Sequence, residues 1–217
     1  AVEALEQLDL LREIGPNHSG HANLKAAALG RIGDYQEALD LYEEVLASVP
    51  DQPKVWMSYG HTLKTLGRQD DCIRAYRKAI DVLPSLGEVW WSLANLKTMR
   101  FDDGHVAAME AQIARNDISR EDRFHLHFAL GRAYEERGQA KPAFDHYARG
   151  NALRSQDLGY DPEEITAHVA ASKKLFTPEF LKARVGQGCS SPDPIFILGM
   201  PRAGSTLIEQ ILASHSQ

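Results

Sequence analysis

The chain has 217 residues and a mass of 24.1 kDa, and its 43% hydrophobic and 25% charged residues match a folded globular protein and exclude intrinsic disorder. Lys and Arg total 24 against 30 Asp and Glu, and no apolar run approaches the ~20 residues that cross a bilayer, so neither nucleic acid nor a membrane is expected as the main partner. The two cysteines, Cys72 and Cys189, form neither a disulfide framework nor a metal cluster, which predicts a protein of the reducing cytoplasm.

Residues recur with a period of 34 along the first part of the chain. Pro16, Pro50 and Pro84 are each 34 residues apart, and so are Gly33 and Gly67. Within a period the order is an apolar helix start, a small residue, a glycine turn, a second small residue, an aromatic residue and a final proline. Residues 53–86 show it as Trp56, Tyr59, Gly60, Leu63, Gly67, Cys72, Tyr76, Ala79 and Pro84.

This order resembles the tetratricopeptide repeat (TPR), a pair of antiparallel helices. The resemblance implies a mainly α protein in which the pairs stack into a right-handed superhelix. The pattern is physically sensible by itself, because small residues at Gly60 and Cys72 let two helices approach closely, Gly67 ends the first helix and Pro84 ends the second. Since one pair cannot bury its own apolar face, several pairs must stack.

The repeat phase predicts where the helices begin. Counting back from Pro16 opens the chain on a second helix, at about 1–14, and the next repeat covers 19–52. The repeat at 87–120 loses the pattern, which then returns at Gly131 and Tyr147 after an insertion of three residues. The sequence leaves two positions open for this insertion, the turn at 100–105 and the connection at 117–123.

The last part of the chain changes in texture. Residues 162–183 predict one amphipathic helix and a short second helix, and residues 184–194 are rich in Gly, Ser and Pro. We therefore expect three parts: a helical solenoid at 1–183, a linker at 184–194 and the truncated start of a second domain at 195–217.

The second domain is expected to open with a strand, a loop and a helix. Residues 195–198 form an apolar run typical of a buried parallel strand, and residues 207–212 place apolar side chains on one helix face. Between them lies the sequence GMPRAGST. Such a loop aims backbone N–H groups and the positive end of a helix dipole at one point, which predicts an anion site with phosphate as its usual ligand.

The basic residue of the loop indicates which phosphate ligand to expect. Gly199 and Gly204 have the spacing of an ATP- or GTP-binding loop, but Ser205 stands where that motif requires lysine, so a nucleotide kinase is disfavoured. The segment PRAGSTL instead resembles the 5′-phosphosulfate loop of sulfotransferases that use 3′-phosphoadenosine 5′-phosphosulfate (PAPS). That resemblance implies a cation at Arg202 and donor-binding positions at Arg202, Ala203, Gly204, Ser205 and Thr206, with Ala203 departing from the family's common serine.

Two functions of different classes remain open. The first is a TPR-containing, PAPS-dependent sulfotransferase that transfers a sulfuryl group to a hydroxyl, with this fragment alone expected to be inactive and no metal required. The second is a non-catalytic TPR scaffold for protein–protein interaction. Under either function, a concave groove for a protein or peptide is expected at Asn23, Arg31, Met57, His61, Lys64, Trp91, Asn95, Phe128 and Arg132.

Overall fold

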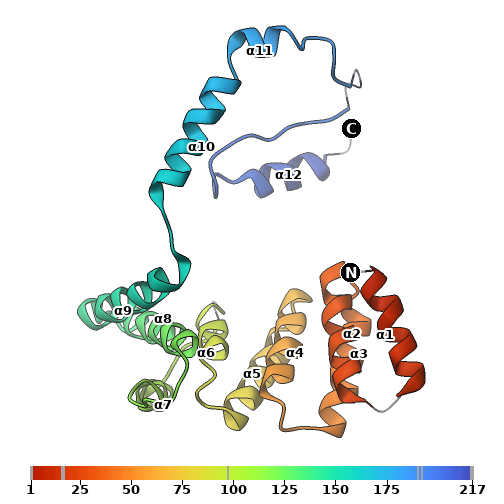
Figure 1. The fold of residues 1–217 in the computed structure, drawn as a ribbon. Helices are drawn as coiled ribbons and strands as arrows, with labels where there is room; N and C mark the ends of the chain where they lie inside the picture. The colour runs from red at the N-terminus through yellow and green to blue at the C-terminus, as the bar shows by residue number, and fades with distance from the viewer. Residues whose placement is uncertain (1, 16–17, 97, 190, 192, 216–217) are drawn as a thin grey trace. The chain divides into compact units, whose positions relative to one another are not determined.

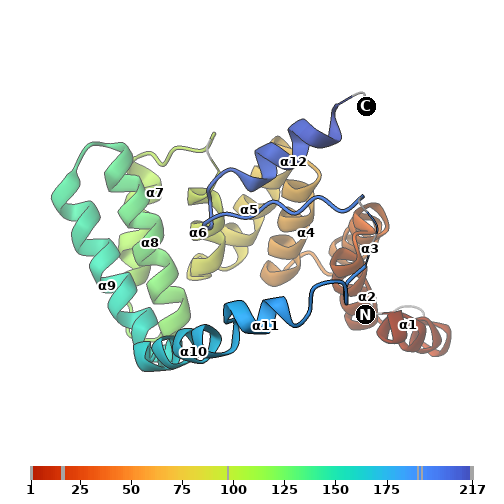
Figure 2. The ribbon, with the colours of Figure 1, turned by 90° about the horizontal axis from the view of Figure 1, so that it is seen from above.

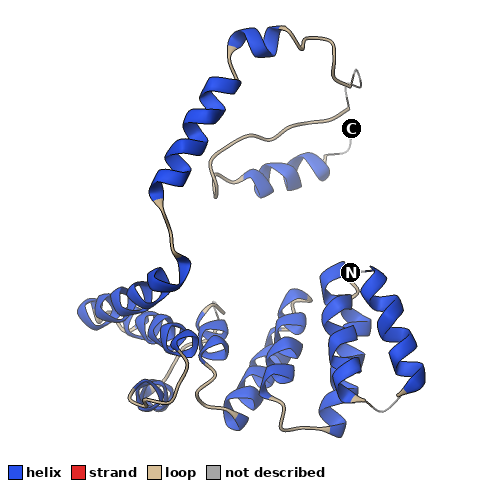
Figure 3. Cartoon of the chain, in the orientation of Figure 1, coloured by secondary structure: helices blue, strands red, loops and turns tan. Residues whose placement is uncertain are grey.

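The computed structural model describes residues 2–15, 18–96, 98–189, 191 and 193–215. The chain divides into two compact units, an N-terminal unit of residues 1–160 and a C-terminal unit of residues 161–217. All regular elements of the described residues are helices, and none of these residues forms a strand (Figure 3). The linker expected at 184–194 stays a prediction.

The N-terminal unit consists of helices joined by short connections (Figure 1). Three pairs of consecutive helices, α2–α3, α4–α5 and α8–α9, pack closely, and α4 and α5 lie between the other two pairs (Figure 2). The predicted stack of helix pairs is therefore confirmed. The described bounds are α1 (Val2–Ile14), α2 (Ser19–Ile32), α3 (Tyr35–Ser48), α4 (Pro53–Thr65), α5 (Gln69–Val82), α6 (Gly87–Ala94), α7 (Asp103–Ile113), α8 (Arg120–Glu136) and α9 (Ala140–Leu158).

The turn inside each of these pairs has the same hydrogen-bond geometry. Gly33, Gly67 and Gly138 have positive φ angles of 95°, 75° and 70°. In each turn the residue after the glycine donates its N–H to a carbonyl five residues earlier, as from Arg68 to Leu63 at 3.0 Å. A left-handed glycine that closes a helix in this way satisfies carbonyls left free at the helix end. The glycine turns predicted from the sequence are confirmed.

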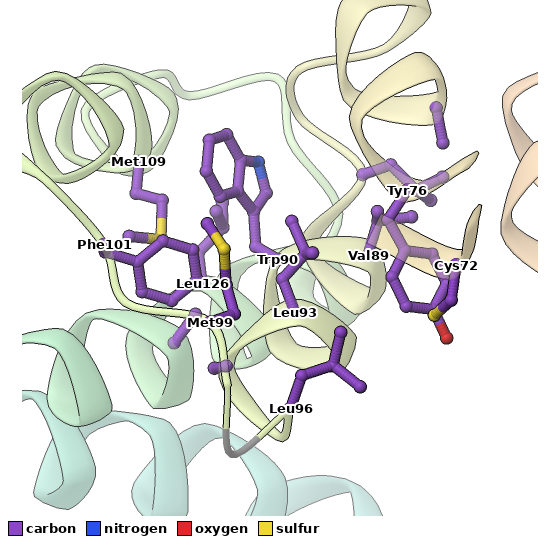
Figure 4. Close-up of a cluster of buried hydrophobic side chains, with 14 of the residues drawn as sticks. Cys72, Tyr76, Val89, Trp90, Leu93, Leu96, Met99, Phe101, Met109 and Leu126 are labelled. Atoms are coloured by element: carbon purple, nitrogen blue, oxygen red, sulfur yellow. The ribbon is translucent and has the colours of Figure 1, made fainter. Parts of the chain in front are cut away.

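Glycines also allow close helix contacts inside the pairs. A methyl group added at Gly60 would lie 2.5 Å from the Tyr76 ring, and one added at Gly131 would lie 2.6 Å from the Tyr147 ring. Each tyrosine follows its glycine by 16 residues, so the two contacts are copies of one repeat feature. Cys72 and Tyr76 are fully buried in the main core, which continues through α6 and α8 (Figure 4).

The fourth repeat departs from the regular pattern, and the structure locates the insertion. Helix α7 begins at Asp103, 34 residues after α5 begins at Gln69, so the phase is still intact there. Helix α9 begins at Ala140, 37 residues after Asp103, and α8 begins early and extends over 17 residues. The three extra residues therefore lie in the connection between α7 and α8 and in the first turn of α8, which is the second of the two expected positions.

Two histidines face each other where α8 packs against α9. The Nδ1 atoms of His127 and His146 lie 3.0 Å apart, so one ring donates a proton and the other accepts it. The His146 ring stacks on Tyr134, whose hydroxyl donates to the Glu110 carboxylate. Burial, followed by the neighbouring His146, lowers the pKa of His127 to about 4, and burial also lowers the pKa of His146.

This histidine pair predicts a loss of stability in mild acid. Because the folded-state pKa of His127 lies below its ordinary value of 6.5, the unfolded chain takes up the proton first. The stabilisation is therefore complete above pH 6.5 and is lost as the pH falls toward 4. We expect the free energy of unfolding to drop by about 2 kcal/mol over that range. Urea unfolding at pH 7.5 and 4.5 measures the drop.

A His127→Gln variant serves as the control for this prediction. Glutamine keeps a polar group beside His146 but does not titrate, so the variant should lose part of the acid-dependent drop. His61 and His125 also have pKa values lowered by burial, and they account for a remaining drop in the variant. An identical pH dependence in the two proteins would contradict the role of this pair.

The C-terminal unit contains α10 (Pro162–Leu175), α11 (Pro178–Lys182) and α12 (Ser205–Ala213). The long and short helices expected over 162–183 are confirmed. The strand expected at 195–198 is wrong: this segment is loop, and Ile195, Phe196 and Leu198 are 71%, 83% and 91% exposed. A strand needs a neighbouring strand to pair its backbone groups, and the described residues supply none.

Candidate functional site

The loop before α12 has the backbone geometry of an anion site. Gly204 caps the helix with a φ of 86°, and Arg202 has a φ of 64°, the one positive value among the described non-glycine residues. The Ala203 N–H closes a turn onto the Met200 carbonyl at 3.0 Å. The first helical bond of α12 runs from Ile208 to Gly204, so the backbone N–H groups before Ile208 have no partner within the helix.

The structure brings the predicted donor-binding residues into one short segment. Arg202, Ala203, Gly204, Ser205 and Thr206 are all exposed, and they follow one another through the loop into the first turn of α12. A methyl group added at Gly204 would meet nothing within 4 Å, so a ligand can approach the backbone there. The roles assigned to these five residues stay predictions.

A second candidate site lies between α2, α3 and α4 in the N-terminal unit. Two predicted groove residues, Arg31 and His61, line this hydroxyl cavity of about 470 Å³. Burial lowers the pKa of His61, and its Nε2 lies 3.1 Å from the Ser92 hydroxyl of α6. The lining residues are Ala27, Gly30, Arg31, Tyr35, Tyr42, Ser58, His61, Thr62 and Thr65.

A third candidate site lies between α6, α8 and α9. Trp91 and Phe128, both predicted for the groove, line this aromatic cavity of about 450 Å³ with their ring centroids 5.5 Å apart. The Arg154 guanidinium carbon lies 5.2 Å from the Phe124 ring centroid. The lining residues are Trp91, Glu121, Phe124, His125, Phe128, Tyr147 and Arg154.

The other predicted groove residues are not lining residues of either cavity. Met57 is half-buried and packs against the main core, and the Asn95 amide donates to the Trp91 carbonyl at 3.0 Å. Arg132 forms ion pairs within α8, to Glu135 at 3.3 Å and Glu136 at 3.0 Å. The remaining two residues are the half-buried Asn23 on α2 and the exposed Lys64 on α4. The predicted groove therefore divides into two cavities and several separate positions.

Sequence reasoning missed five residues of the aromatic cavity. Glu121, Phe124, His125 and Phe128 follow the spacing i, i+3, i+4, i+7, which places them on one face of α8. That spacing was the available signal, but counting repeat positions selected Phe128 alone. Tyr147 and Arg154 come from α9 and have no such signal.

Metal and membrane features were searched over the described part of the chain. No group of three or more His, Cys, Asp or Glu side chains there is arranged to hold a metal ion. No described helix is both long and apolar enough to span a bilayer.

Comparison with known families matches two segments of the chain. Residues 53–85 match the tetratricopeptide repeat family. The chain contains tetratricopeptide repeats. Residues 194–217, which include the loop before α12, match the sulfotransferase family. The TPR residues therefore lie in the N-terminal unit, and the sulfotransferase match lies in the C-terminal unit.

Two curated relatives extend the comparison. An uncharacterized protein of Aquifex aeolicus (strain VF5) is 28% identical over 193 residues, covering 89% of this chain and 25% of that protein. The small glutamine-rich tetratricopeptide repeat-containing protein 2 of Mycosarcoma maydis is 30% identical over 82 residues, covering 38% of this chain and 23% of that protein. The chain spans about a quarter of the length of these relatives.

Solved structures share the fold of the TPR region. The crystal structure of MamA covers 72% of this chain and 90% of its own, with 15% identity and a TM-score of 0.55. A MamA structure from Desulfovibrio magneticus RS-1 covers 71% and 86%, with 20% identity and a TM-score of 0.52. PilW, titled a type IV pilus biogenesis factor, covers 64% and 63%, with 20% identity and a TM-score of 0.53. At these identities the likeness shows the fold alone.

Proposed function

We propose that the chain is part of a TPR-bearing sulfotransferase, whose N-terminal unit binds protein and whose loop before α12 binds the phosphosulfate of PAPS. The observation that carries this proposal is the coincidence of the sulfotransferase match at 194–217 with an anion-binding loop geometry at Arg202 and Gly204. A reducing, cytoplasmic setting is part of the proposal, because both Cys72 and Cys189 are free thiols.

The residues of the loop fit the chemistry of the donor. PAPS carries several negative charges, and Arg202 is an exposed cation beside the positive end of the α12 dipole. Ser205 and Thr206 add hydroxyl donors in the first turn of the helix. When bound, the donor supplies the sulfuryl group, whose bond to the phosphate oxygen breaks as a bond to the acceptor hydroxyl forms. The acceptor proton leaves to a general base that the proposal does not identify.

Sulfate transfer and donor binding test the proposal together. The full-length protein is incubated with labelled PAPS and a mixture of hydroxyl acceptors, and binding of adenosine 3′,5′-bisphosphate is measured by calorimetry. We expect saturable binding and transfer of label. Tight binding of ATP with Mg²⁺ and no response to PAPS would overturn the sulfotransferase proposal.

A non-catalytic TPR scaffold is the alternative, and one observation favours it. The N-terminal unit contains two cavities on its helix pairs, whereas the sulfotransferase match covers 24 residues. Under this alternative the N-terminal unit binds a protein partner and the full-length protein transfers no sulfate.

A further inference from the structure

The aromatic cavity is walled by four rings from three helices. Trp91 comes from α6, Phe124 and Phe128 from α8, and Tyr147 from α9. The Phe124 and Phe128 centroids lie 6.1 Å apart in an edge-on arrangement. A methyl group added at Gly150 would come within 3.1 Å of the Phe128 ring, so this glycine leaves room for the ring between α8 and α9. The cavity thus offers aromatic faces to a ligand.

The charges around this cavity are mainly negative. Glu121 on its rim is exposed and has no hydrogen-bond or ion-pair partner among the described residues. The carboxylates of Glu88, Glu121 and Asp122 all lie near enough to His125 to raise its pKa, but burial outweighs them and leaves the pKa lowered. The His125 ring is therefore uncharged at neutral pH. Arg154 is the cation that acts against these three carboxylates on His125.

The one cation at the cavity is already stacked on a wall. The Arg154 guanidinium lies over the Phe124 ring, which shows that an aromatic face here accepts a cation. Trp91 and Phe128 remain as the facing aromatic pair, and Glu121 remains as an unpaired carboxylate. An aromatic pair with a nearby carboxylate suits a positively charged group on an alkyl stem, because the rings attract the charge and pack against the methylenes.

We propose that the aromatic cavity binds a lysine or arginine side chain from a basic segment of a partner protein. The stem of that side chain packs between Trp91 and Phe128, and its charged group pairs with Glu121. This inference rests on the proposed protein-binding role of the N-terminal unit, and it names the chemistry of the partner. A carboxylate or phosphate ligand is disfavoured, because it would face the three nearby acidic groups.

Peptide titration of the chain tests this proposal. Three capped peptides of the form Ser-Gly-X-Gly-Ser carry lysine, its neutral isostere norleucine or glutamate at X. The indole N–H signal of Trp91, assigned with a Trp91→Phe variant, reports occupancy in NMR spectra. We expect saturable shifts with the lysine peptide, about three- to tenfold weaker binding of norleucine and no binding of glutamate. Equal binding of lysine and norleucine, or any saturable binding of glutamate, overturns the proposal.

Two matched variants separate local pairing from general charge effects. Glu121→Gln removes the rim carboxylate and should weaken the lysine peptide about three- to tenfold without changing the melting temperature. Glu3→Gln makes the same change at an exposed position of α1 and should leave binding unchanged. Equal weakening by both variants overturns the pairing with Glu121.

A further variant tests the aromatic wall. Phe128→Leu keeps an apolar surface but removes one ring face, so it should weaken lysine binding more than norleucine binding. Equal weakening of the two peptides contradicts the contact between the cation and the ring. None of these binding results depends on sulfate transfer. Failure of the cavity proposal is therefore distinguishable from failure of the enzyme proposal.

Discussion

Replacing Arg202 with alanine in the full-length protein is expected to remove most of the sulfate-transfer rate. In the proposed function the guanidinium opposes negative charge that shifts during transfer, and it holds the donor beside the α12 N-terminus. Loss of one preorganised electrostatic contact of this kind typically costs ~10²–10³-fold, or about 3–4 kcal/mol. Initial rates of label transfer from PAPS measure the effect.

Arg202→Lys separates the charge from the shape of the side chain. Arg202 has a left-handed φ of 64°, and alanine and lysine adopt that conformation no more easily, so both variants carry a similar backbone cost. Lysine restores the charge without the bidentate fork and should recover part of the rate.

Arg184→Ala is the matched control for Arg202→Ala. It removes another exposed arginine from the C-terminal unit, one whose guanidinium lies over the Phe180 ring rather than in the loop. We expect its transfer rate to stay close to that of the unchanged protein. Full transfer activity in Arg202→Ala would remove the sulfotransferase proposal and leave the TPR scaffold.

The repeat period explains which features of the fold were predictable. A 34-residue period copies both a turn and a contact, so Gly33 and Gly67 mark equivalent helix ends. The Trp56 and Trp90 indole N–H groups each donate to a proline carbonyl six residues earlier, both at 2.8 Å. Such contacts are local or repeat at fixed spacing, and sequence reasoning can transfer them from one period to the next.

Features that depend on distant segments were not predictable in the same way. The apolar run at 195–198 satisfies the local preference of a strand, but strand formation requires a partner that the described residues do not supply. The aromatic cavity depends on how α6, α8 and α9 meet after the irregular α7–α8 connection. The left-handed backbone of Arg202 has no signal in its residue type, because arginine rarely adopts it.

The contact at Gly87 is a consequence of this irregular region, and its replacement by alanine should destabilise the chain strongly. Gly87 is the first residue of α6, and its N–H donates to the Asp122 carboxylate of α8 at 2.9 Å. A methyl group there would lie 2.8 Å from both the carbonyl carbon and the Cα of Asp122, and closer still to the carbonyl oxygen. Unlike a side chain, this helix backbone cannot rotate away, so α6 and α8 would have to separate.

We expect Gly87→Ala to lower the free energy of unfolding by about 3 kcal/mol, at the upper end of the overpacking range. Gly30→Ala is the control: Gly30 lies inside α2, and its new methyl group would meet nothing within 4 Å. Because alanine favours helix, that control should be stabilised by about 0.5–1 kcal/mol. Urea unfolding followed by tryptophan fluorescence gives both values. If Gly87→Ala were as stable as Gly30→Ala, the close approach of α6 to α8 would be wrong, and with it the walls of the aromatic cavity.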